Sequence, residues 1–331
     1  MKPQSLTPKN SIIIIAMLLS FIGCEKENEE IVQPIMPKVE IFSLGSNAVT
    51  LKSDLVESKS PVVSVGLCLS TSPNPTITNS NIRGYLCDSA MYCRVEHLIP
   101  NTQYYAKLYV INTDGTWYGD EFNFTTNATV ADIDGNIYNT VTIGSQVWTV
   151  ENLRTTRFND GSGISYINTS WEDLQTAGFT YYDFSINNKP VYGLLYNWPT
   201  VSSNKLCPEG WHIPSDSEWK VLMENLGGEF IAGAMLKNSE PTTWAFSNPV
   251  ANNLSGFSAL PGGASSAVIG VFTGLGYNGL WWTSTIEYPN GSDLGYNIFW
   301  GVSHGSPSVL RNGFMNRAGS INFLSVRCIK D

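Results

Sequence analysis

The sequence predicts a β-sandwich followed by a second domain of mixed α and β structure. Three observations support this fold class. Charged residues make up only 14% of the 331 residues, and 29 glycines accompany many polar uncharged residues, a loop-rich and β-rich composition. Short segments with alternating polar and apolar residues lie between residues 37 and 126. One helix-forming pattern, with its own start and stop signals, lies in the second half.

The first residues predict an exported lipoprotein. Lys2 and Lys9 accompany an apolar run of 13 residues that is too short to cross a bilayer as a helix. This pattern is typical of a secretory signal peptide, here residues 1–23. Cys24 follows at once and resembles the acylated cysteine of a bacterial lipobox, although Phe21 departs from the usual leucine. We expect acylation of Cys24; ordinary cleavage beside an incidental cysteine is the alternative.

A short acidic tether, residues 24–34, follows the expected lipid anchor. Its EKENEE stretch (25–30) resembles the signal that sends Bacteroidetes lipoproteins to the outer face of the cell. We therefore expect a lipid-anchored envelope protein, exposed on the outer membrane, although the sequence leaves the choice of inner or outer membrane open. The net charge of −9 without a basic stripe argues against nucleic acid as a partner.

The first domain is predicted over residues 35–126. Turn residues separate its strand-like segments, which are VEIFSL, AVTLKSDL, VVSVGLCLS and YYAKLYVIN. The stretch LIPNTQY (98–104) matches a pattern of fibronectin type III domains, and Tyr104 resembles their corner tyrosine, whose hydroxyl bonds back to the loop backbone. The resemblance implies a fibronectin type III-like sandwich that serves as a spacer.

A linker at 127–131 leads into the second domain, residues 132–331, which begins with two predicted hairpin turns. The spacing of Asp132, Asp134 and Asn136 suggests a calcium loop at first sight. An EF-hand would then require glycine and glutamate where this chain has Ile137 and Ile143. The pattern therefore favours a hairpin turn.

The stretch LCPEGWHIPSDSEWKVLMENLGG (206–228) predicts a capped helix. Ser215 and Glu218 form a capping box, and Gly227 ends the helix. One apolar face carries Trp219, Leu222, Met223 and Leu226. His212, between two apolar residues, is either a packed histidine or a catalytic base, and the pattern favours the packed residue.

The chain has six cysteines, and five remain if Cys24 is acylated. Cys207 and Cys328 would bracket the second domain if they were paired, and closing so long a loop would stabilise it by up to about 4–5 kcal/mol. The other cysteines, at 68, 87 and 93, cannot all pair among themselves, so one is expected to be a buried free thiol. No CxxC motif occurs, which argues against a zinc ribbon or a thioredoxin-like site.

A family resemblance covers residues 132–331. The stretches that carry it, in order, are DIDGNIYNTVTIGSQVWTVENLRTTRFNDG, YGLLYNWPTV, LCPEGWHIPSDSEW, LSGFSALPGG, WWTST and FLSVRCIKD. They resemble the Fibrobacter succinogenes major paralogous domain of surface and secreted proteins, which is similar in architecture to C-type-lectin-like domains. The resemblance implies an α+β domain with a Cys207–Cys328 disulfide. It implies no established activity.

The motifs for catalysis are weak. GVSHG (301–305) matches the G-x-S-x-G nucleophile elbow, but strand-like residues follow it where a helix is required. No HExxH motif or phosphate-binding loop is present. Formylglycine-generating oxidases share the lectin-like fold but use a reactive cysteine pair, and both cysteines of this domain are expected to be structural. We expect no catalytic residues, no bound metal and no cofactor, with a hydrolase as the lesser alternative.

The loop-rich face over residues 274–320 is the predicted ligand site. It is dense in aromatic, amide and small residues, which suit sugars because rings stack on the apolar face of a pyranose. The candidate residues are Trp282, Glu287, Asn297, Trp300, Arg311 and Asn312. The alternative is that the tryptophans belong to the core. Since Trp281 and Trp282 are adjacent on a strand, they face opposite sides, and one should lie away from the main core.

These observations predict a surface lipoprotein that binds a glycan or another extracellular polymer or protein without catalysis. The second hypothesis is a structural or assembly component of the envelope that binds no small ligand. The sequence does not identify the ligand, its metal dependence or the oligomeric state.

Overall fold

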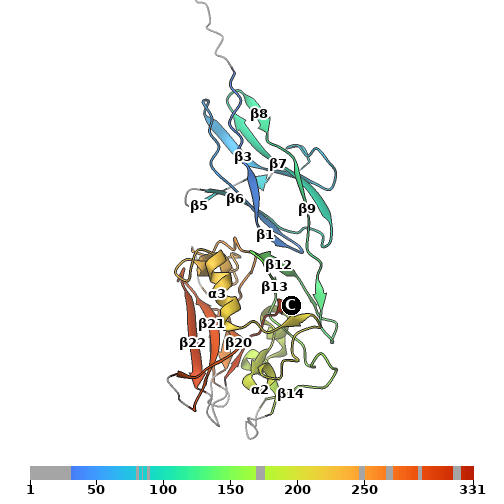
Figure 1. Ribbon diagram of the computed structural model, residues 1–331, viewed down its shortest axis with the longest axis vertical. Coiled ribbons are helices and arrows are strands. Elements are labelled where there is room, and N and C mark those ends of the chain that lie inside the picture. Colours follow the sequence, from blue (N-terminus) through green and yellow to red (C-terminus); the bar gives the residue numbers. More distant parts are fainter. Residues whose placement is uncertain are drawn as a thin grey trace, which may run out of the picture. The chain divides into compact units, whose positions relative to one another are not determined.

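The protein is mostly β-structure, with several antiparallel sheets and a few short helices in the C-terminal part, as a computed structural model shows (Figure 1). The structure describes residues 31–79, 82–83, 85–87, 90–168, 176–245, 250–265, 271–289, 293–315 and 322–331. The predicted signal peptide, Cys24 and the start of the tether lie outside these residues. Within them, no helix is long and apolar enough to span a membrane.

Two sheets with a common core form the N-terminal β-sandwich. One contains β1 (Val39–Gly45), β2 (Val49–Ser53), β5 (Tyr85–Cys87) and β6 (Ala90–Val95). The other contains β3 (Val62–Ser70), β4 (Ile82–Arg83), β7 (Gln103–Asn112), β8 (Gly115–Tyr118) and β9 (Phe122–Thr125). Apolar residues of both sheets, such as Leu51 and Leu108, pack into one cluster between them. The apolar residues of the alternating pattern that predicted the sandwich therefore form this shared core.

The corner tyrosine of the sandwich behaves as predicted. Tyr104 is buried at the start of β7, and its hydroxyl accepts a hydrogen bond of 3.0 Å from the amide of Ile99. Its ring stacks on Phe124 at 5.9 Å. The hydroxyl thus satisfies a loop amide that the sheet leaves without a partner.

The first sheet of the sandwich continues into the second predicted domain. Strand β1 pairs with β12 (Thr140–Ile143), so that Ser43 lies opposite Ile143. The sheet then extends through β13 (Gln146–Thr149) and β24 (Ile329–Lys330) to β17 (Trp211–His212). The side chain of Asn127, in the expected linker, donates to Leu44 O at 2.9 Å. Residues 33–331 consequently form one compact unit.

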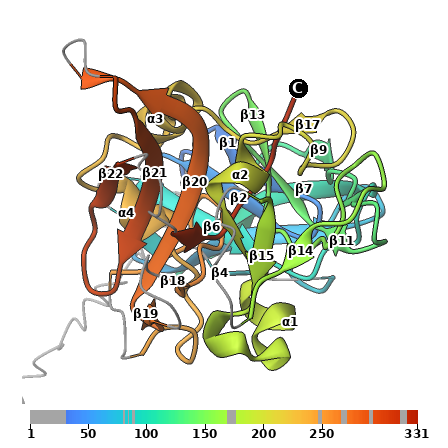
Figure 2. The same ribbon diagram turned by 90° about the horizontal axis from the view of Figure 1, so that it is seen from below.

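The remaining strands form three further sheets. A two-stranded sheet joins β10 (Val130–Ala131) to β11 (Ile137–Tyr138). A six-stranded sheet has the order β14 (Ser165–Tyr166), β15 (Gly178–Thr180), β16 (Leu195–Asn197), β23 (Phe323–Leu324), β18 (Gly262–Ser265) and β19 (Phe272–Leu275). A three-stranded sheet has the order β20 (Asn278–Glu287), β21 (Tyr296–Ser303) and β22 (Val309–Met315) (Figure 2).

The helices are short except for one. They are α1 (Lys189–Tyr192), α2 (Trp198–Val201), α3 (Asp216–Asn225) and α4 (Ala232–Leu236), with 3₁₀ turns η1 (Tyr182–Phe184) and η2 (Ile186–Asn188). The predicted capping box begins α3: Ser215 Oγ accepts from the amide of Glu218, and Glu218 Oε2 accepts from the amide of Ser215. The apolar face of α3 buries Trp219, whose ring stacks on Trp300 at 6.1 Å.

Strand β20 has a core on each of its two sides. Trp281 packs into the cluster that contains Trp219 and the rest of the apolar face of α3. Trp282 packs into the cluster that contains the sulfurs of Cys207 and Cys328. The two rings face opposite sides, as expected, but both are only 1% exposed. Neither ring therefore reaches solvent.

Candidate functional site

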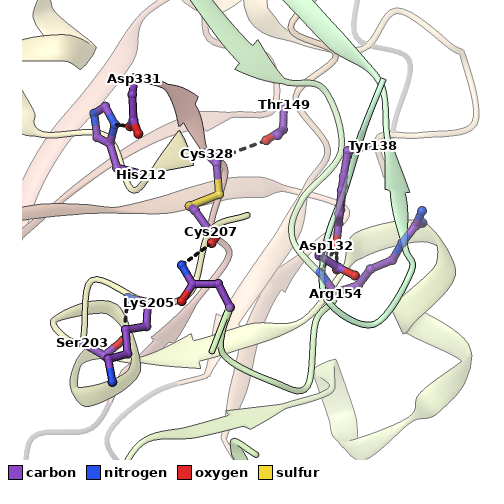
Figure 3. Close-up of a disulfide and its surroundings, with 11 residues drawn as sticks. Asp132, Tyr138, Thr149, Arg154, Ser203, Lys205, Cys207, His212, Cys328 and Asp331 are labelled. Carbon is purple, nitrogen blue, oxygen red and sulfur yellow. Dashed lines mark hydrogen bonds and ion pairs between the residues drawn. A yellow bond between two sulfur atoms is a disulfide. The ribbon is translucent and has the colours of Figure 1, made fainter. Parts of the chain in front are cut away.

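A disulfide closes the C-terminal part of the protein (Figure 3). It joins Cys207 to Cys328 across 121 positions, with Cα atoms 5.9 Å apart. The amide of Cys328 donates to Thr149 Oγ1 at 3.0 Å, and Asn159 Nδ2 donates to the carbonyl of Cys207 at 3.1 Å. The pairing implied by the family resemblance is confirmed. Both sulfurs are committed to structure, so neither offers a thiol for reaction.

His212 lies between two carboxylates near the disulfide. Its Nδ1 is 2.6 Å from Asp331 Oδ1, and its Nε2 is 2.8 Å from Glu218 Oε1. Burial by itself lowers the pKa of His212, but the two carboxylates outweigh it and raise the pKa above the ordinary value. Because both ring nitrogens are engaged, neither faces a nucleophile that it could deprotonate. The geometry favours the structural interpretation of this histidine over a catalytic base.

The stability contributed by His212 should depend on pH. A raised folded-state pKa stabilises the protein fully below the unfolded value of 6.5, and this stabilisation is lost as the pH rises through the folded value. The side chain is 42% exposed, so solvent screening limits the effect to about 1 kcal/mol or less. We expect His212→Gln to lower the free energy of unfolding more at about pH 5.5 than at about pH 8.5, measured by urea denaturation. An equal loss at both values would contradict the ion pairs.

A buried carboxylate ties helix α3 to the three-stranded sheet. Asp216 accepts from Trp300 Nε1 at 2.9 Å, from Arg311 Nε at 2.7 Å and from Arg311 Nη2 at 3.1 Å. Lys220 Nζ lies 2.7 Å from Asp216 Oδ2, the oxygen that also accepts from Arg311 Nη2. Burial alone would raise the pKa of Asp216, but these donors, with Arg311 foremost, bring it below its usual value. Asp216 is therefore an ionised acceptor that orients Arg311.

A hollow of about 370 Å³ opens beside this cluster, on β20, β21 and β22. Its lining residues are Glu287, Pro289, Tyr296, Ile298, Arg311, Asn312 and Gly313. Arg311 Nη2 reaches Glu287 Oε2 at 2.6 Å, so this guanidinium lies between two carboxylates. Asp216 and Glu287 raise the pKa of Arg311, which keeps the cation in place. The hollow thus combines an aromatic ring, an amide and charges that neutralise one another.

The predicted ligand residues divide into two groups. Glu287, Arg311 and Asn312 lie together at the hollow. Trp282 and Trp300 are 1% and 0% exposed, and their indole nitrogens donate to Tyr196 O and to Asp216. Their rings are covered by protein and offer no face to a ligand, so the prediction is corrected for these two residues.

Asn297 is also withdrawn from the surface. It is buried on β21, on the opposite side of the strand from Tyr296 and Ile298, which face the hollow. In the described part of the chain its Oδ1 has no hydrogen-bond partner. A ligand in the hollow would not reach it, so it too is removed from the candidate site.

Sequence reasoning missed two residues that shape the hollow. Tyr296 lines it. Residues four apart on a strand lie on the same side, so the candidate Trp300 could have pointed to Tyr296 as well. Asp216 lies in the first turn of α3, where a carboxylate favours the helix dipole, and this position alone suggests no part in a site. Its second role depends on Arg311, which is 95 positions away and invisible to local patterns.

The acidic turn at residues 132–138 has a structural explanation. Asp132 Oδ1 accepts from the amides of Asp134 and Asn136, and its Oδ2 accepts from the hydroxyl of Tyr138 at 2.6 Å. Asp134 forms an ion pair with Arg157. The carboxylates are thus occupied by protein donors, which supports the hairpin-turn interpretation. No group of three metal-ligating side chains occurs within the described ranges.

The GVSHG motif lies between two strands. Ser303 is the last residue of β21, and the chain turns directly into β22. Buried Lys237 holds this turn, since its Nζ donates to the carbonyls of Ser303 and Ser306. A nucleophile elbow needs a helix after the serine, so this strand–turn–strand arrangement argues against a hydrolase site.

Two cysteines of the sandwich should resist alkylation in the native protein. Cys68 and Cys93 are buried and carry free thiols. Burial raises the pKa of Cys68 to about 11, against a small opposing effect of Lys107, and that of Cys93 to about 12. We expect iodoacetamide at about pH 8 to modify them only after unfolding in urea, as peptide mass spectrometry would show, because the thiolate is the reactive form. Rapid native modification of either would contradict its burial. The side chain of Cys87 lies outside the described part.

Comparisons with known proteins give one family and a larger number of structural likenesses, of which two weak ones are described below. The Fibrobacter succinogenes major domain matches residues 141–330. No curated protein matches the chain. A computer-redesigned β-sandwich protein is 16% identical, with 30% of this chain and 98% of that chain covered, at a TM-score of 0.23. The twitchin kinase region of C. elegans is 10% identical, with 58% of this chain and 34% of that chain covered, at a TM-score of 0.24.

Proposed function

The chain belongs to the Fibrobacter succinogenes major domain family, and we propose that it is an exported surface lipoprotein that binds a glycan or another polymer without catalysis. The anchor would be acylated Cys24, and the membrane would be a partner only through it. We further propose a fibronectin type III-like fold for the sandwich and a C-type-lectin-like fold for residues 132–331. The bond from Tyr104 to the loop supports the first, and the Cys207–Cys328 disulfide supports the second.

The composition of the hollow at β20–β22 carries the binding proposal. A sugar needs an aromatic or apolar surface for its ring and polar groups for its hydroxyls. Tyr296 and Pro289 supply the first, while Asn312 and Glu287 supply the second. Glu287 is 52% exposed and can accept from a ligand hydroxyl without giving up Arg311. Neutral carbohydrate fits best, because the charges in this hollow already pair with one another.

The same geometry favours binding over hydrolysis. Glycosidases use one protonated carboxyl group as an acid and a second carboxylate as a base or nucleophile. Asp216 cannot act as the acid at neutral pH, since its pKa is below the usual value and its oxygens are occupied. His212 has both nitrogens engaged by carboxylates. Glu287 would be left without a catalytic partner among these groups.

One observation favours the structural alternative. Trp282 and Trp300, the aromatic residues from which the binding face was first inferred, belong to the core. Under this alternative, the part of the protein that the disulfide closes would be a rigid structural component of the envelope. Binding experiments separate the two functions.

We expect Asn312→Ala to weaken glycan binding by about tenfold, the effect of one lost hydrogen bond to a ligand. The chain from residue 25 onward would be applied to an array of plant, mucin and microbial glycans, and positive ligands would be titrated by calorimetry. Asn123→Ala, an exposed amide on β9 of the sandwich, is the matched control and should bind as the wild type does. If the wild type binds no glycan on the array, the result would favour the structural role.

A further inference from the structure

Three aromatic side chains form a shelf at the edge of the six-stranded sheet. Tyr166 lies on the edge strand β14, opposite Phe179 on the neighbouring strand β15. Figure 2 shows these two strands side by side. The Tyr166 ring stacks on buried Phe179 with centroids 5.6 Å apart and planes 29° apart. Tyr181 contacts both rings, at 5.1 Å and 5.9 Å. We call Tyr166, Phe179 and Tyr181 the aromatic shelf.

The shelf holds one ring at the surface in a fixed position. Tyr166 is 41% exposed even though its ring contacts both Phe179 and Tyr181, so part of the ring remains open to solvent. A tyrosine has few rotatable bonds, and a ring already held by neighbours loses little entropy when a ligand covers it. Burial is the main cause that raises the pKa of Tyr181, and the nearby Tyr166 raises it further. The hydroxyl of Tyr181 therefore remains a hydrogen-bond donor at neutral pH.

The chain after the shelf is held in a strained conformation. Asp183 and Phe184 are consecutive non-glycine residues with φ of 53° and 52°, in the left-handed region. Such residues cost of order 1–3 kcal/mol each and persist where the surrounding structure holds them. Here Phe272 packs against Phe184 at 5.0 Å and against Tyr182 at 5.1 Å. This packing of Phe272 therefore holds the residues that directly follow Tyr181 in place.

The described residues next to the shelf along the chain carry little charge. Among the described residues 165–168 and 176–188, Asp183 is the one charged side chain. A ligand with carboxylate or sulfate groups would meet this negative charge with no cation in the same segments to offset it. A basic ligand would find one exposed carboxylate, that of Asp183, among the described residues of these two segments. An uncharged ligand with a flat apolar face and hydroxyl groups at its edge fits the open ring of Tyr166 and the hydroxyls of Tyr166 and Tyr181.

We propose that the aromatic shelf is a binding site for a pyranose ring of an uncharged polysaccharide. The apolar face of the sugar stacks on Tyr166, and its hydroxyls bond to the edge of the shelf. The site is a surface ring at a sheet edge, which suits an internal ring of a polymer that runs across it. It lies on a different sheet from the hollow at β20–β22, so it stands independently of the function proposed there. A polymer that occupied both sites would gain avidity from their linkage.

Affinity gel electrophoresis of the chain from residue 25 onward tests this site. Native gels would contain hydroxyethylcellulose, mixed-linkage β-glucan, xylan, galactomannan or, as an acidic probe, polygalacturonate. We expect at least one neutral polymer to retard the wild type. Tyr166→Ala should weaken that binding about tenfold, while Tyr166→Phe should retain it, because stacking needs the ring. Tyr105→Ala, in the sandwich, is the matched control and should bind as the wild type does.

The outcomes separate this site from the hollow. Loss in Tyr166→Ala with retention in Asn312→Ala supports the shelf alone, and loss in both supports two sites. Loss only in Asn312→Ala overturns the shelf, as does the absence of retardation by every neutral polymer or retardation by polygalacturonate alone. Tyr166→Leu keeps apolar bulk on Phe179 but removes the flat ring. If Tyr166→Ala fails to fold, equal binding by Tyr166→Leu and the wild type would overturn the proposal.

Discussion

Replacing Cys207 and Cys328 together with alanine should lower the free energy of unfolding by about 4–5 kcal/mol. The disulfide closes a loop of 121 positions, and a cross-link of that length removes much of the conformational entropy of the unfolded chain. It also joins the segment before α3 to Cys328, which directly precedes β24, an inner strand of the eight-stranded sheet between β13 and β17. Urea denaturation of the wild type and of the double variant would measure the difference.

Two controls make the disulfide experiment specific. Dithiothreitol should destabilise the wild type by a similar amount and leave the double variant unchanged, because the variant has no bond to reduce. Cys68→Ala removes a buried thiol of the sandwich that forms no disulfide, and should cost only the loss of its packing. If the native protein were equally stable with and without reductant, or if Cys207 and Cys328 were alkylated without it, the disulfide would be absent.

Replacing Arg327 with methionine should cost about 3–5 kcal/mol, because it leaves buried polar groups without partners. Arg327 is fully buried and donates to Asn152 Oδ1 at 3.1 Å, to the carbonyl of Ser258 at 3.0 Å and to the carbonyl of Phe257. The guanidinium also lies 4.1 Å from the centroid of the Phe257 ring and 5.4 Å from that of Trp281. Methionine would fill most of the space but could donate to none of these acceptors.

The matched control for Arg327 is an exposed arginine. Arg157→Met breaks an ion pair with Asp134 in which the arginine side chain is 46% exposed, so it should cost about 1 kcal/mol or less. Arg327→Lys should fall between the two, since lysine keeps a charge but cannot reproduce the planar fork of donors. Urea denaturation gives all three values. Equal stability of Arg327→Met and Arg157→Met would show that the buried network contributes little.

Local patterns in the sequence predicted the elements that depend on near neighbours. The capping box of Ser215 and Glu218 and the bond from Tyr104 to Ile99 span five residues or fewer, and both are present in the structure. The acidic turn that begins at Asp132 was also interpreted from its own residues. Such features follow from backbone groups that a nearby side chain can satisfy, so a short stretch of sequence contains all the participants.

The candidate site was predicted in part. Glu287, Arg311 and Asn312 were found because polar residues in a region rich in aromatic residues suggest a ligand, and the structure brings them together at one hollow. Trp282 and Trp300 were misassigned because alternation shows which side of a strand a residue faces but not what covers that side. Both sides of β20 are covered, by elements that lie far apart in the sequence.

The sequence by itself determined the β-rich class of this protein, its capped helix, its turns and, through family resemblance, the pairing of Cys207 with Cys328. Only the tertiary structure decided that β1 pairs with β12, that the tryptophans of the expected binding face are core, and that Tyr166 stands open on Phe179. The physical reason is the distance along the chain between the residues that interact. Hydrogen bonds within a turn or a helix end involve neighbours in the chain, whereas the exposure of a ring depends on every segment that can fold over it.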